Sequence, residues 1–504
     1  MLETAVASLR FGASMTLGVR FNLRSLERLV GAMLETTREF GGIGSEGAEL
    51  LAGPGLDDDT RREMQLRRFR SQALRAMRTT SYYGNLFAQA GLDPAELSHE
   101  GIATIPLTPK EALRGDPDAF VNRTVRPSLR ATTTGTTGWP TSVQFSRYEM
   151  RALVALASIA VILRRQVEAD DLVQIGISSR AILGVTGVMG ACANIGAAVY
   201  LAGLLDPEHT LALLTERRSI PGKRERVSVM STYPSYLGEI VETGLRLGYG
   251  PKDFGLRRLL VGGELLTQGL RARCQRLFGP VELVSNYGMT ELAPFGGNVC
   301  SQEHLHFDPS GGLVEVLDLE TRRPAGHGQA GSIVATPFFP YRETTLLLRY
   351  DTEDVVRTVA GPLTCEMRNL PATSNILGKR RLSVRHDGGW TFLRDVVEAL
   401  EGVEAVPLPA RFGLWATSDG VGVEVLARSD APEVGDAIHS RLEQEGVPVR
   451  ELRVVTDRAA LRQPIPLRGD LRDGSLAHAG GRGGSNGSSP PRPHAAVLAS
   501  GGAS

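Results

Sequence analysis

The chain has 504 residues, more than one hydrophobic core usually supports, so we expect at least two domains. It carries 56 basic and 56 acidic residues. This balance gives no overall attraction to nucleic acid or to anionic membranes, and we expect neither as a partner. The cysteines stand far apart, at positions 192, 274, 300 and 365, and residues 1–17 lack a secretory leader pattern. Both features predict a cytoplasmic location.

Residues 1–60 form an N-terminal extension whose apolar residues recur with helical spacing, from Leu9 to Met33. We expect helices that pack on the body of the protein or on a partner. From residue 61 to 379, short β-rich runs alternate with helical stretches such as 147–165, which predicts α/β layers around a buried sheet. The expected strands include residues 172–176, 227–231, 259–261 and 332–336.

Residues 182–205 carry no charged side chain and are long enough to span a bilayer. Several glycines and Asn194 interrupt the segment, which favours a buried helix followed by a strand. A membrane anchor is the alternative interpretation, and extraction without detergent would distinguish the two.

Beyond Gly378, a β-rich segment around Trp390, a helix at 394–401, a strand at 421–427 and a helix at 432–445 predict a small α+β domain over residues 380–474. Residues 475–504 are dominated by Gly, Ser, Pro and Ala. Such a segment cannot bury enough apolar surface to order itself, so we expect a disordered tail.

Residues 131–143 read A-T-T-T-G-T-T-G-W-P-T-S-V. Glycines and threonines in this density offer backbone N–H and side-chain O–H donors that can converge on phosphate oxygens, which predicts a nucleotide triphosphate as ligand. The segment is not a P-loop, because the spacing and the lysine of that motif are missing. An ordinary polar turn between strands is the alternative.

Further motifs follow in order: P-L-T-P-K-E at 106–111, V-G-G-E at 261–264, N-Y-G-M-T-E at 286–291, R-Y-D-T-E-D at 349–354 and I-L-G-K-R at 376–380. In this order they resemble the adenylate-forming superfamily of acyl-CoA synthetases, in its phenylacetate–CoA ligase-like branch. Residues 67–87 also resemble the opening helix of that family. The resemblance covers about residues 68–473. It implies a large α/β N-terminal domain followed by a small α+β C-terminal lid domain.

The resemblance also implies a two-step reaction. A carboxylic acid, of aromatic or apolar character, attacks the α-phosphate of ATP, and a thiol of CoA or a carrier protein then displaces AMP. Mg²⁺ accompanies the ATP. The identity of the acid, the thiol or amine acceptor, and the formation of a homodimer are left open.

By the same resemblance, Glu291 binds Mg²⁺, Thr290 contacts the α-phosphate, Tyr287 stacks on adenine and Asp354 accepts the ribose hydroxyls. The expected phosphate-binding residues are Thr132, Thr133, Thr134, Gly135, Thr136, Thr137 and Gly138. Gly262, Gly263, Glu264, Gly288 and Lys379 complete the expected nucleotide site. The expected acyl-pocket residues are Tyr233, Tyr236, Pro294 and Phe295. Taken singly, each residue also has an ordinary structural interpretation, such as a core aromatic or a solvated charge.

The chain departs from the family at three places. Trp139 stands where the phosphate loop has lysine, Arg381 and Leu382 replace the acidic hinge pair, and no lysine follows Lys379. Arg468 lies near the expected position of the lost C-terminal lysine, although the guanidinium differs from an ammonium in shape and reach. These losses support an alternative: a divergent acyl transferase, or a protein that binds nucleotide or a partner without catalysis, with the N-terminal extension as the docking element.

Some phenylacetate–CoA ligase-like proteins carry a Cys…His…Cys-x-Cys cluster that resembles a structural zinc site. Cys300, His306 and Cys365 occupy comparable places here, but Met367 replaces the last cysteine, and a thioether binds Zn²⁺ poorly. His304 is a candidate fourth ligand, although we expect its two-residue separation from His306 to make joint ligation awkward. The alternative is a set of buried, inert cysteines.

Overall fold

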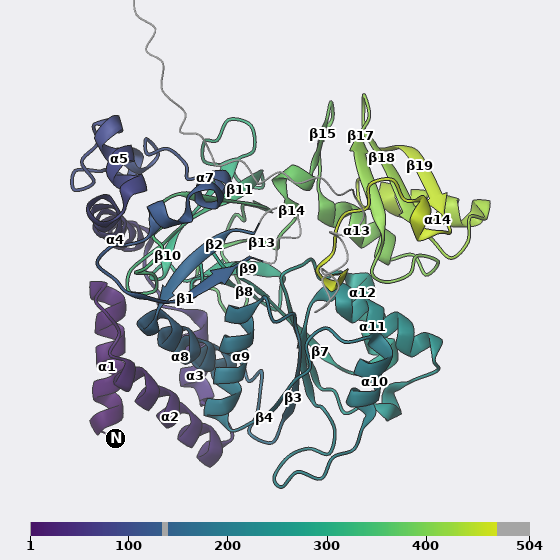
Figure 1. Cartoon of the computed structure of the whole chain (residues 1–504), viewed down its shortest axis with the longest axis horizontal. Coiled ribbons are helices and arrows are strands. Elements are labelled where there is room, and N and C mark those ends of the chain that lie inside the picture. Colours follow the sequence, from purple (N-terminus) through teal and green to yellow (C-terminus); the bar gives the residue numbers. More distant parts are fainter. Residues whose placement is uncertain (1, 134–139, 471–504) are drawn as a thin grey trace, which may run out of the picture.

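The computed structural model describes residues 2–133 and 140–470. The predicted disordered tail and most of the threonine-rich segment, residues 134–139, lie outside the described residues. Figure 1 shows the chain as a large α/β body with a smaller β-rich unit at one end of its long axis.

An eight-stranded sheet forms the centre of the body, in the order β13-β9-β8-β7-β6-β5-β3-β4. Its strands from β4 to β7 run parallel, and β7, β8, β9 and β13 pair antiparallel. The strands are β3 (Leu172–Gly176), β4 (Ala198–Leu201), β5 (Val229–Thr232), β6 (Arg258–Gly262), β7 (Glu282–Tyr287), β8 (Gly297–Val299), β9 (His304–Phe307) and β13 (Ala372–Ser374). The strands predicted at 172–176, 227–231 and 259–261 are confirmed, with ends that move by up to two residues.

Helices cover both faces of this sheet, as parallel strands require because both of their faces must be buried. Figure 1 shows α8 and α9 on one side and α10, α11 and α12 on the other. Their bounds are α8 (Arg147–Leu163), α9 (Ile182–Ile195), α10 (Pro207–Thr215), α11 (Pro234–Arg246) and α12 (Gln268–Phe278). Helix α8 begins with a capping box between Ser146 and Glu149.

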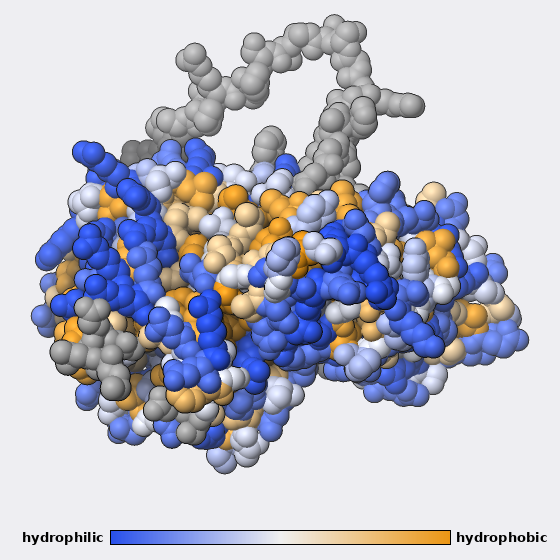
Figure 2. Space-filling model, turned by 90° about the horizontal axis from the view of Figure 1, so that it is seen from below, coloured by the Kyte–Doolittle hydropathy of each residue, from blue (hydrophilic) through white to orange (hydrophobic). Residues whose placement is uncertain are grey.

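The uncharged segment 182–205 forms helix α9 followed by strand β4, as the sequence favoured. Among the described residues, no helix combines the length and the apolar character needed to cross a membrane. On the face shown in Figure 2, hydrophilic residues interrupt the hydrophobic patches.

A four-stranded sheet, β10-β11-β12-β14, and the hairpin β1-β2 complete the body. The strands are β1 (Pro127–Thr132), β2 (Ser142–Ser146), β10 (Gly312–Asp318), β11 (Ala330–Pro337), β12 (Tyr350–Arg357) and β14 (Gly378–Lys379). The adjoining helices are α4 (Asp58–Thr79), α5 (Ser81–Ala90), α6 (His99–Ile102) and α7 (Lys110–Gly115). The single opening helix expected at 67–87 is therefore wrong: the chain leaves the helix at Thr80, whose side chain caps α5.

The N-terminal extension forms α1 (Leu2–Leu17), α2 (Leu23–Phe40) and α3 (Gly44–Ala52). It packs on the body, where Phe21 and Leu26 bury their side chains against Ala152, Ala155 and Tyr341. Arg20 forms an ion pair of 2.7 Å with the buried Glu343. The extension is thus part of the folded body.

The smaller unit after β14 has a hydrophobic core of its own, built from α13, α14 and the strands β17 to β19. Its elements are β15 (Val384–His386), β16 (Gly389–Thr391), α13 (Leu393–Glu401), β17 (Phe412–Ala416), β18 (Val421–Leu426), α14 (Pro432–Gln444) and β19 (Val449–Val455). This confirms the fold class, a large α/β domain with a small α+β domain. We call this unit, residues 380–470 as described, the lid.

The lid is joined to the body by contacts between the end of α13 and the start of α12. The Thr267 hydroxyl and the Ala410 N–H donate to the buried carboxylate of Glu401, and the Gln268 N–H donates to Glu398. In return, Arg273 of α12 donates to the carbonyls of Val403 and Val406. Burial raises the pKa of Glu401 to about 7, because the carboxylate loses water that its two hydrogen bonds do not fully replace.

This pKa predicts a pH-dependent stability of the lid. The pKa of Glu401 is 4.5 in the unfolded chain and about 7 in the folded protein. Its contribution to stability is therefore fully present below pH 4.5 and is lost as pH rises through about 7. Glu401→Gln removes the charge, and its amide oxygen can still accept from the Ala410 N–H while its NH2 group donates to the Thr267 hydroxyl, which reverses that second hydrogen bond. We therefore expect it to be more stable than the wild type by up to about 3 kcal/mol at pH 8, and to differ little at pH 4.5.

Urea unfolding followed by tryptophan fluorescence measures this difference, since Trp390 and Trp415 both lie in the lid. The control is Glu404→Gln, which removes an exposed carboxylate just beyond α13. An equal effect of Glu401→Gln at the two pH values would show that the ionisation of Glu401 does not govern lid stability.

Candidate nucleotide-binding and catalytic site

The site begins where the parallel strands β5, β6 and β7 end. Carboxyl ends of neighbouring parallel strands meet at one edge of a sheet, and ligands bind there in open α/β sheets. This edge carries Tyr233 after β5, the Gly262-Gly263-Glu264 segment after β6, and Tyr287 at the end of β7. Three motifs that the sequence gives as separate segments therefore adjoin one another.

Asp354 of β12 lies against this edge and is held by two donors. The Tyr287 hydroxyl donates to its Oδ2 at 2.8 Å, and Lys379 Nζ lies 2.8 Å from its Oδ1. Lys379 faces Asp354 because β14 pairs with β12 in that register. Burial, together with the neighbouring Asp354 charge, holds the pKa of Tyr287 well above its usual value, so the phenol keeps its proton and remains a donor. The structure thus brings Asp354, Tyr287 and Lys379 together.

Glu291 lies deeper, with 1 % of its surface exposed, and forms an ion pair of 3.0 Å with Lys110. The Tyr350 hydroxyl donates to the same carboxylate oxygen at 3.1 Å. Burial would raise the pKa of Glu291, but the charge and hydrogen bond of Lys110 outweigh that effect, and the pKa lies below its usual value. Glu291 is therefore a buried, ionised carboxylate, a ligand type that suits a hard cation such as Mg²⁺.

Lys110 is a site residue that the sequence analysis did not select. It begins helix α7 directly after Pro109, and the preceding Thr108 bridges in parallel to Tyr350 at the start of β12. That bridge positions Lys110 next to Glu291. The P-L-T-P-K-E motif contained the signal, because it holds one of only four lysines in the chain, but nothing local indicated its partner.

The threonine-rich segment joins β1 to β2, which pair as an antiparallel hairpin. Thr132 is exposed and Thr133 half-buried, and the Thr133 hydroxyl accepts a hydrogen bond from the Thr141 N–H at 3.0 Å. Thr134, Gly135, Thr136, Thr137 and Gly138, like Trp139, lie outside the described residues.

A segment of the lid closes another side of the site. The Arg468 N–H donates to Glu264 at 2.5 Å, and the Gly469 N–H donates to the Ser235 hydroxyl at 2.9 Å. The Arg468 guanidinium lies over the Tyr233 ring at 5.7 Å. Gly263 has a φ of +82°, and a side chain there would also meet Arg468 at 3.2 Å. Arg468, the residue expected near the lost lysine position, thus lies at the site.

Some of the remaining predicted residues lie at the site, and others lie in the hydrophobic core. Gly288 is exposed, with open space where a side chain would point, and Thr290 is half-buried beside Glu291. Tyr233 adjoins the site through Arg468. Tyr236 and Phe295 lie in the hydrophobic core, and their place in an acyl pocket stays a prediction. Tyr236 is fully buried and its hydroxyl is bonded to Thr210 and the Leu205 carbonyl, while Phe295 packs against Gly311 and Gly312. Pro294 follows a cis peptide bond.

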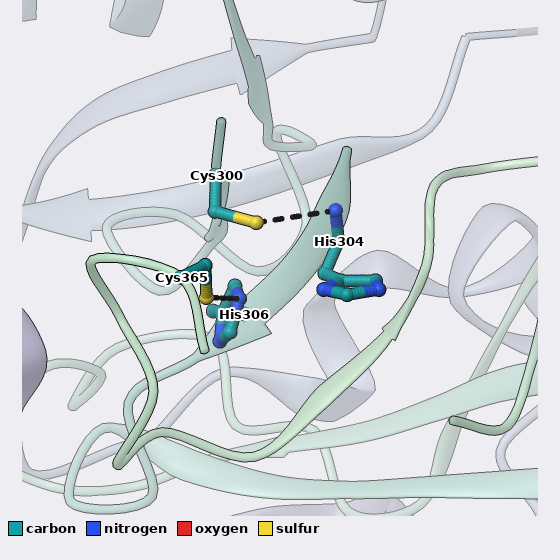
Figure 3. Close-up of side chains that lie close together, drawn as sticks. All are labelled: Cys300, His304, His306 and Cys365. Carbon is teal, nitrogen blue, oxygen red and sulfur yellow. Dashed lines mark hydrogen bonds between the residues drawn. The ribbon is translucent and has the colours of Figure 1, made fainter. Parts of the chain in front are cut away.

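A second cluster is formed by Cys300 directly after β8, His304 and His306 of β9, and Cys365 of the loop before β13. Donor atoms of Cys300, His304, His306 and Cys365 all lie within 4.8 Å of one another (Figure 3). The expectation that His304 and His306 could ligate together only awkwardly is wrong, since residues two apart on a strand share one face. Met367 packs beside the two cysteines, and its thioether is not needed for a fourth ligand.

The chemistry of this cluster fits a metal ion. Two thiols and two imidazoles form a common tetrahedral zinc donor set. His306 Nδ1 lies 3.2 Å from the Leu370 carbonyl, which leaves Nε2 facing Cys365 at 3.3 Å. Burial lowers the pKa of His306 and keeps the imidazole neutral. The buried Nδ1 of His304 has no hydrogen-bond partner among the described residues, so a ligand atom is available there.

The chain is similar to several known proteins. Residues 127–336 match the family model of the AMP-binding enzyme. The chain is 24 % identical over 328 residues to the phenylacetate-coenzyme A ligase of Aromatoleum evansii, covering 62 % of this chain and 69 % of that protein. It is 26 % identical over 322 residues to the enzyme of the same name from Pseudomonas putida, covering 60 % and 68 %.

Among solved structures, the chain is similar to 2-hydroxyisobutyryl-CoA ligase in the postadenylation state with 2-HIB-AMP. The TM-score is 0.67 at 18 % identity, with coverage of 84 % of this chain and 92 % of that one. The same ligase in its thioesterification state, with 2-HIB-AMP and CoA, gives a TM-score of 0.56, again at 18 % identity, with coverage of 81 % and 89 %. These similarities concern the fold.

The Lys110–Glu291 pair yields a prediction about stability. Removing one partner of a buried ion pair leaves an uncompensated charge, so Lys110→Met should destabilise the protein by about 3–5 kcal/mol at neutral pH. In the wild type, Lys110 keeps the pKa of Glu291 below its usual value, so Glu291 stays ionised from pH 8 to pH 5. In the variant, burial without Lys110 raises this pKa, so the carboxylate takes up a proton as pH falls and the uncompensated charge disappears. The deficit of the variant should therefore shrink between pH 8 and pH 5, as measured by thermal unfolding.

Two further variants make this test specific. Glu111→Gln changes an exposed charge on the same helix and should have little effect. Adding Glu291→Gln to Lys110→Met should recover much of the lost stability, because no ionised group is then left buried. A double variant as unstable as Lys110→Met alone would contradict the ion pair as the cause.

Proposed function

We propose that the chain is a member of the adenylate-forming superfamily, on its phenylacetate–CoA ligase-like side, and that it activates a carboxylic acid with ATP and passes the acyl group to a thiol. The observation that carries the proposal is the convergence on one sheet edge of Glu291 with Lys110, Asp354 with Tyr287 and Lys379, and Arg468. The activity is that of an AMP-forming acid–thiol ligase.

The proposed roles follow from the chemistry of these groups. Asp354 accepts both ribose hydroxyls, since a carboxylate has two oxygens and several lone pairs. Tyr287 lies against the adenine, and Gly262 and Gly263 admit the base to the backbone. Glu291 holds Mg²⁺, which supplies charge neutralisation to the phosphates, and Thr290 donates toward the α-phosphate. The threonines from Thr132 to Thr137 hold the outer phosphates with neutral donors.

Three cations stand around the site despite the missing family lysines. Lys110 lies at the Glu291 end, Lys379 at the Asp354 end, and Arg468 beside Gly263. Attack of a carboxylate on the α-phosphate brings negative charges together, and oriented cations offset that repulsion in a site shielded from water. We propose that Arg468 serves the acyl and α-phosphate side, while Lys110 is released to phosphate when Mg²⁺ binds Glu291.

The acid proposed is aromatic or otherwise apolar, in line with the relatives named phenylacetate-coenzyme A ligase and with Tyr233 at the site. The thiol proposed is that of CoA, with a carrier-protein arm as the alternative. The four cysteines are free and buried, and we propose a cytoplasmic location. We also propose that the protein forms a homodimer.

We propose that the Cys300, His304, His306 and Cys365 cluster holds a structural Zn²⁺. The ion would tie β9 to the loop at 363–370, and that loop also holds the N-terminal extension. Asn369 donates from its backbone to the Ala52 carbonyl and from its side chain to the Gly53 carbonyl at 2.9 Å. The Zn²⁺ ion would therefore hold the N-terminal extension on the body of the protein.

The activity prediction concerns Arg468. With an aromatic acid and ATP, the protein should release pyrophosphate. When CoA is added as well, it should also form the acyl-CoA thioester. Arg468→Ala should reduce acid-dependent pyrophosphate release by about two to three orders of magnitude, as expected when an oriented charge contact is lost. Thioester formation from supplied acyl-adenylate should fall much less.

Arg468→Lys and Arg462→Gln are the comparison variants. The first restores a cation of different shape and should recover part of the rate, while the second alters an exposed arginine of the same segment and should have no effect. A folded protein that releases no pyrophosphate across a broad panel of acids would instead support a binding protein without ligase activity.

The zinc prediction is analytical. Purified protein should contain about one zinc per chain by elemental analysis, and Cys365→Ser should lose it together with thermal stability. Cys274→Ser, at a buried cysteine remote from the cluster, should retain the metal. Equal metal content in the two variants would refute the site.

A further inference from the structure

A groove of about 560 Å³ runs along the outer side of helix α4 and is lined mainly by arginine. None of its lining residues belongs to the site described above. Figure 1 places α4 and α5 at the end of the long axis opposite the lid. The residues that matter for the argument are Arg67, Arg70, Ser71, Leu74, Arg75 and Arg78.

The groove concentrates positive charge on one side of helix α4. In the part of the chain that the structure describes, no carboxylate forms an ion pair with Arg70, Arg75 or Arg78. Elsewhere in the protein, arginines such as Arg257 and Arg273 pair with Asp171 and Glu242. The chain as a whole is neutral, so the surplus is local. Like charges held close together repel one another, and a bound anion would relieve that repulsion.

Two of the guanidinium groups are held in position by contacts that leave donors available. Arg70 donates its Nε to the Leu97 carbonyl at 2.7 Å, so its two terminal nitrogens extend beyond that bond. Arg75 lies 4.1 Å over the Phe339 ring, and its buried Nε has no hydrogen-bond partner among the described residues. Side chains fixed in this way lose little conformational entropy when they bind a ligand.

The shape and chemistry of the groove indicate the kind of ligand. Planar guanidinium forks match the oxygens of phosphate, and Arg is preferred for such recognition. The hydroxyl of Ser71 adds a neutral donor, and Leu74 provides an apolar wall for the rest of a molecule. The volume lies within the usual range of small-molecule sites, about 300–1,000 Å³.

We propose that the groove between Arg67 and Arg78 is a second anion site, which binds a small phosphorylated molecule carrying two or more negative charges. It is separate from the site for ATP and does not depend on ligase activity. Because several sources supply this chemistry, the test uses pyrophosphate, a product of adenylation, and adenosine 3′,5′-bisphosphate, which presents two phosphates on a larger body.

The test is isothermal titration calorimetry on the full chain near physiological ionic strength, without acid or ATP. Arg70→Gln/Arg75→Gln should weaken binding of at least one probe tenfold or more, because each arginine gives charge-assisted hydrogen bonds. The second variant, Arg67→Gln/Arg78→Gln, should also weaken binding. Because both of these side chains are exposed, its effect cannot be attributed to misfolding. Higher salt should weaken the binding.

The matched control is Arg217→Gln/Arg246→Gln, which also removes two positive charges, from exposed arginines that are paired with Glu225 and Glu208. It should leave the binding unchanged. Equal weakening in the control, or binding of both probes that no groove variant alters, would overturn the proposal. So would preferential binding of an acidic peptide over both phosphorylated probes, since the groove would then be a protein-docking surface.

Discussion

Two buried carboxylates, each paired with a lysine, are the constraint on which the site depends. Glu291 and Asp354 are nearly withdrawn from water, and an ionised carboxylate is stable there only when a cation and further donors face it. Lys110 and Lys379 supply the cations, and Tyr350 and Tyr287 supply the donors. The two sheets must meet in one arrangement for all four contacts to form, and the two tyrosine hydrogen bonds fix the position of β12 against β7.

The lid is fixed by the same kind of interaction. Carboxylates of α13 lie at the start of α12, where free backbone N–H groups and the helix dipole favour negative charge. Arg273 of α12 binds the carbonyls that follow α13. Near the hinge, Arg381 pairs with Glu353, so the replaced acidic pair has become a contact with the body. These contacts hold the lid against the body with Arg468 at the site.

Two features lie away from the proposed nucleotide site. The Cys/His cluster adjoins the loop that holds α3, and the arginine groove lies on α4, so each is joined to the N-terminal segments rather than to the lid. Buried thiols with imidazoles are the donors proposed for a metal, whereas clustered guanidinium groups are the donors proposed for an anion. The chain therefore places chemically distinct recognition surfaces on one α/β body.

The amino-acid sequence by itself determined the fold class and the strands of the sheet, because alternating β-rich and helical runs are local patterns that persist in the fold. The order of its motifs also determined which strand ends form the site, since parallel strands end at a common edge. It did not reveal that Lys110 meets Glu291, that Tyr236 and Phe295 are core residues, or that the chain leaves the helix at Thr80. Only the tertiary structure decided these points. Each depends on which distant segments pack together, and the energy of such contacts is set by burial and charge across the fold rather than by neighbours along the chain.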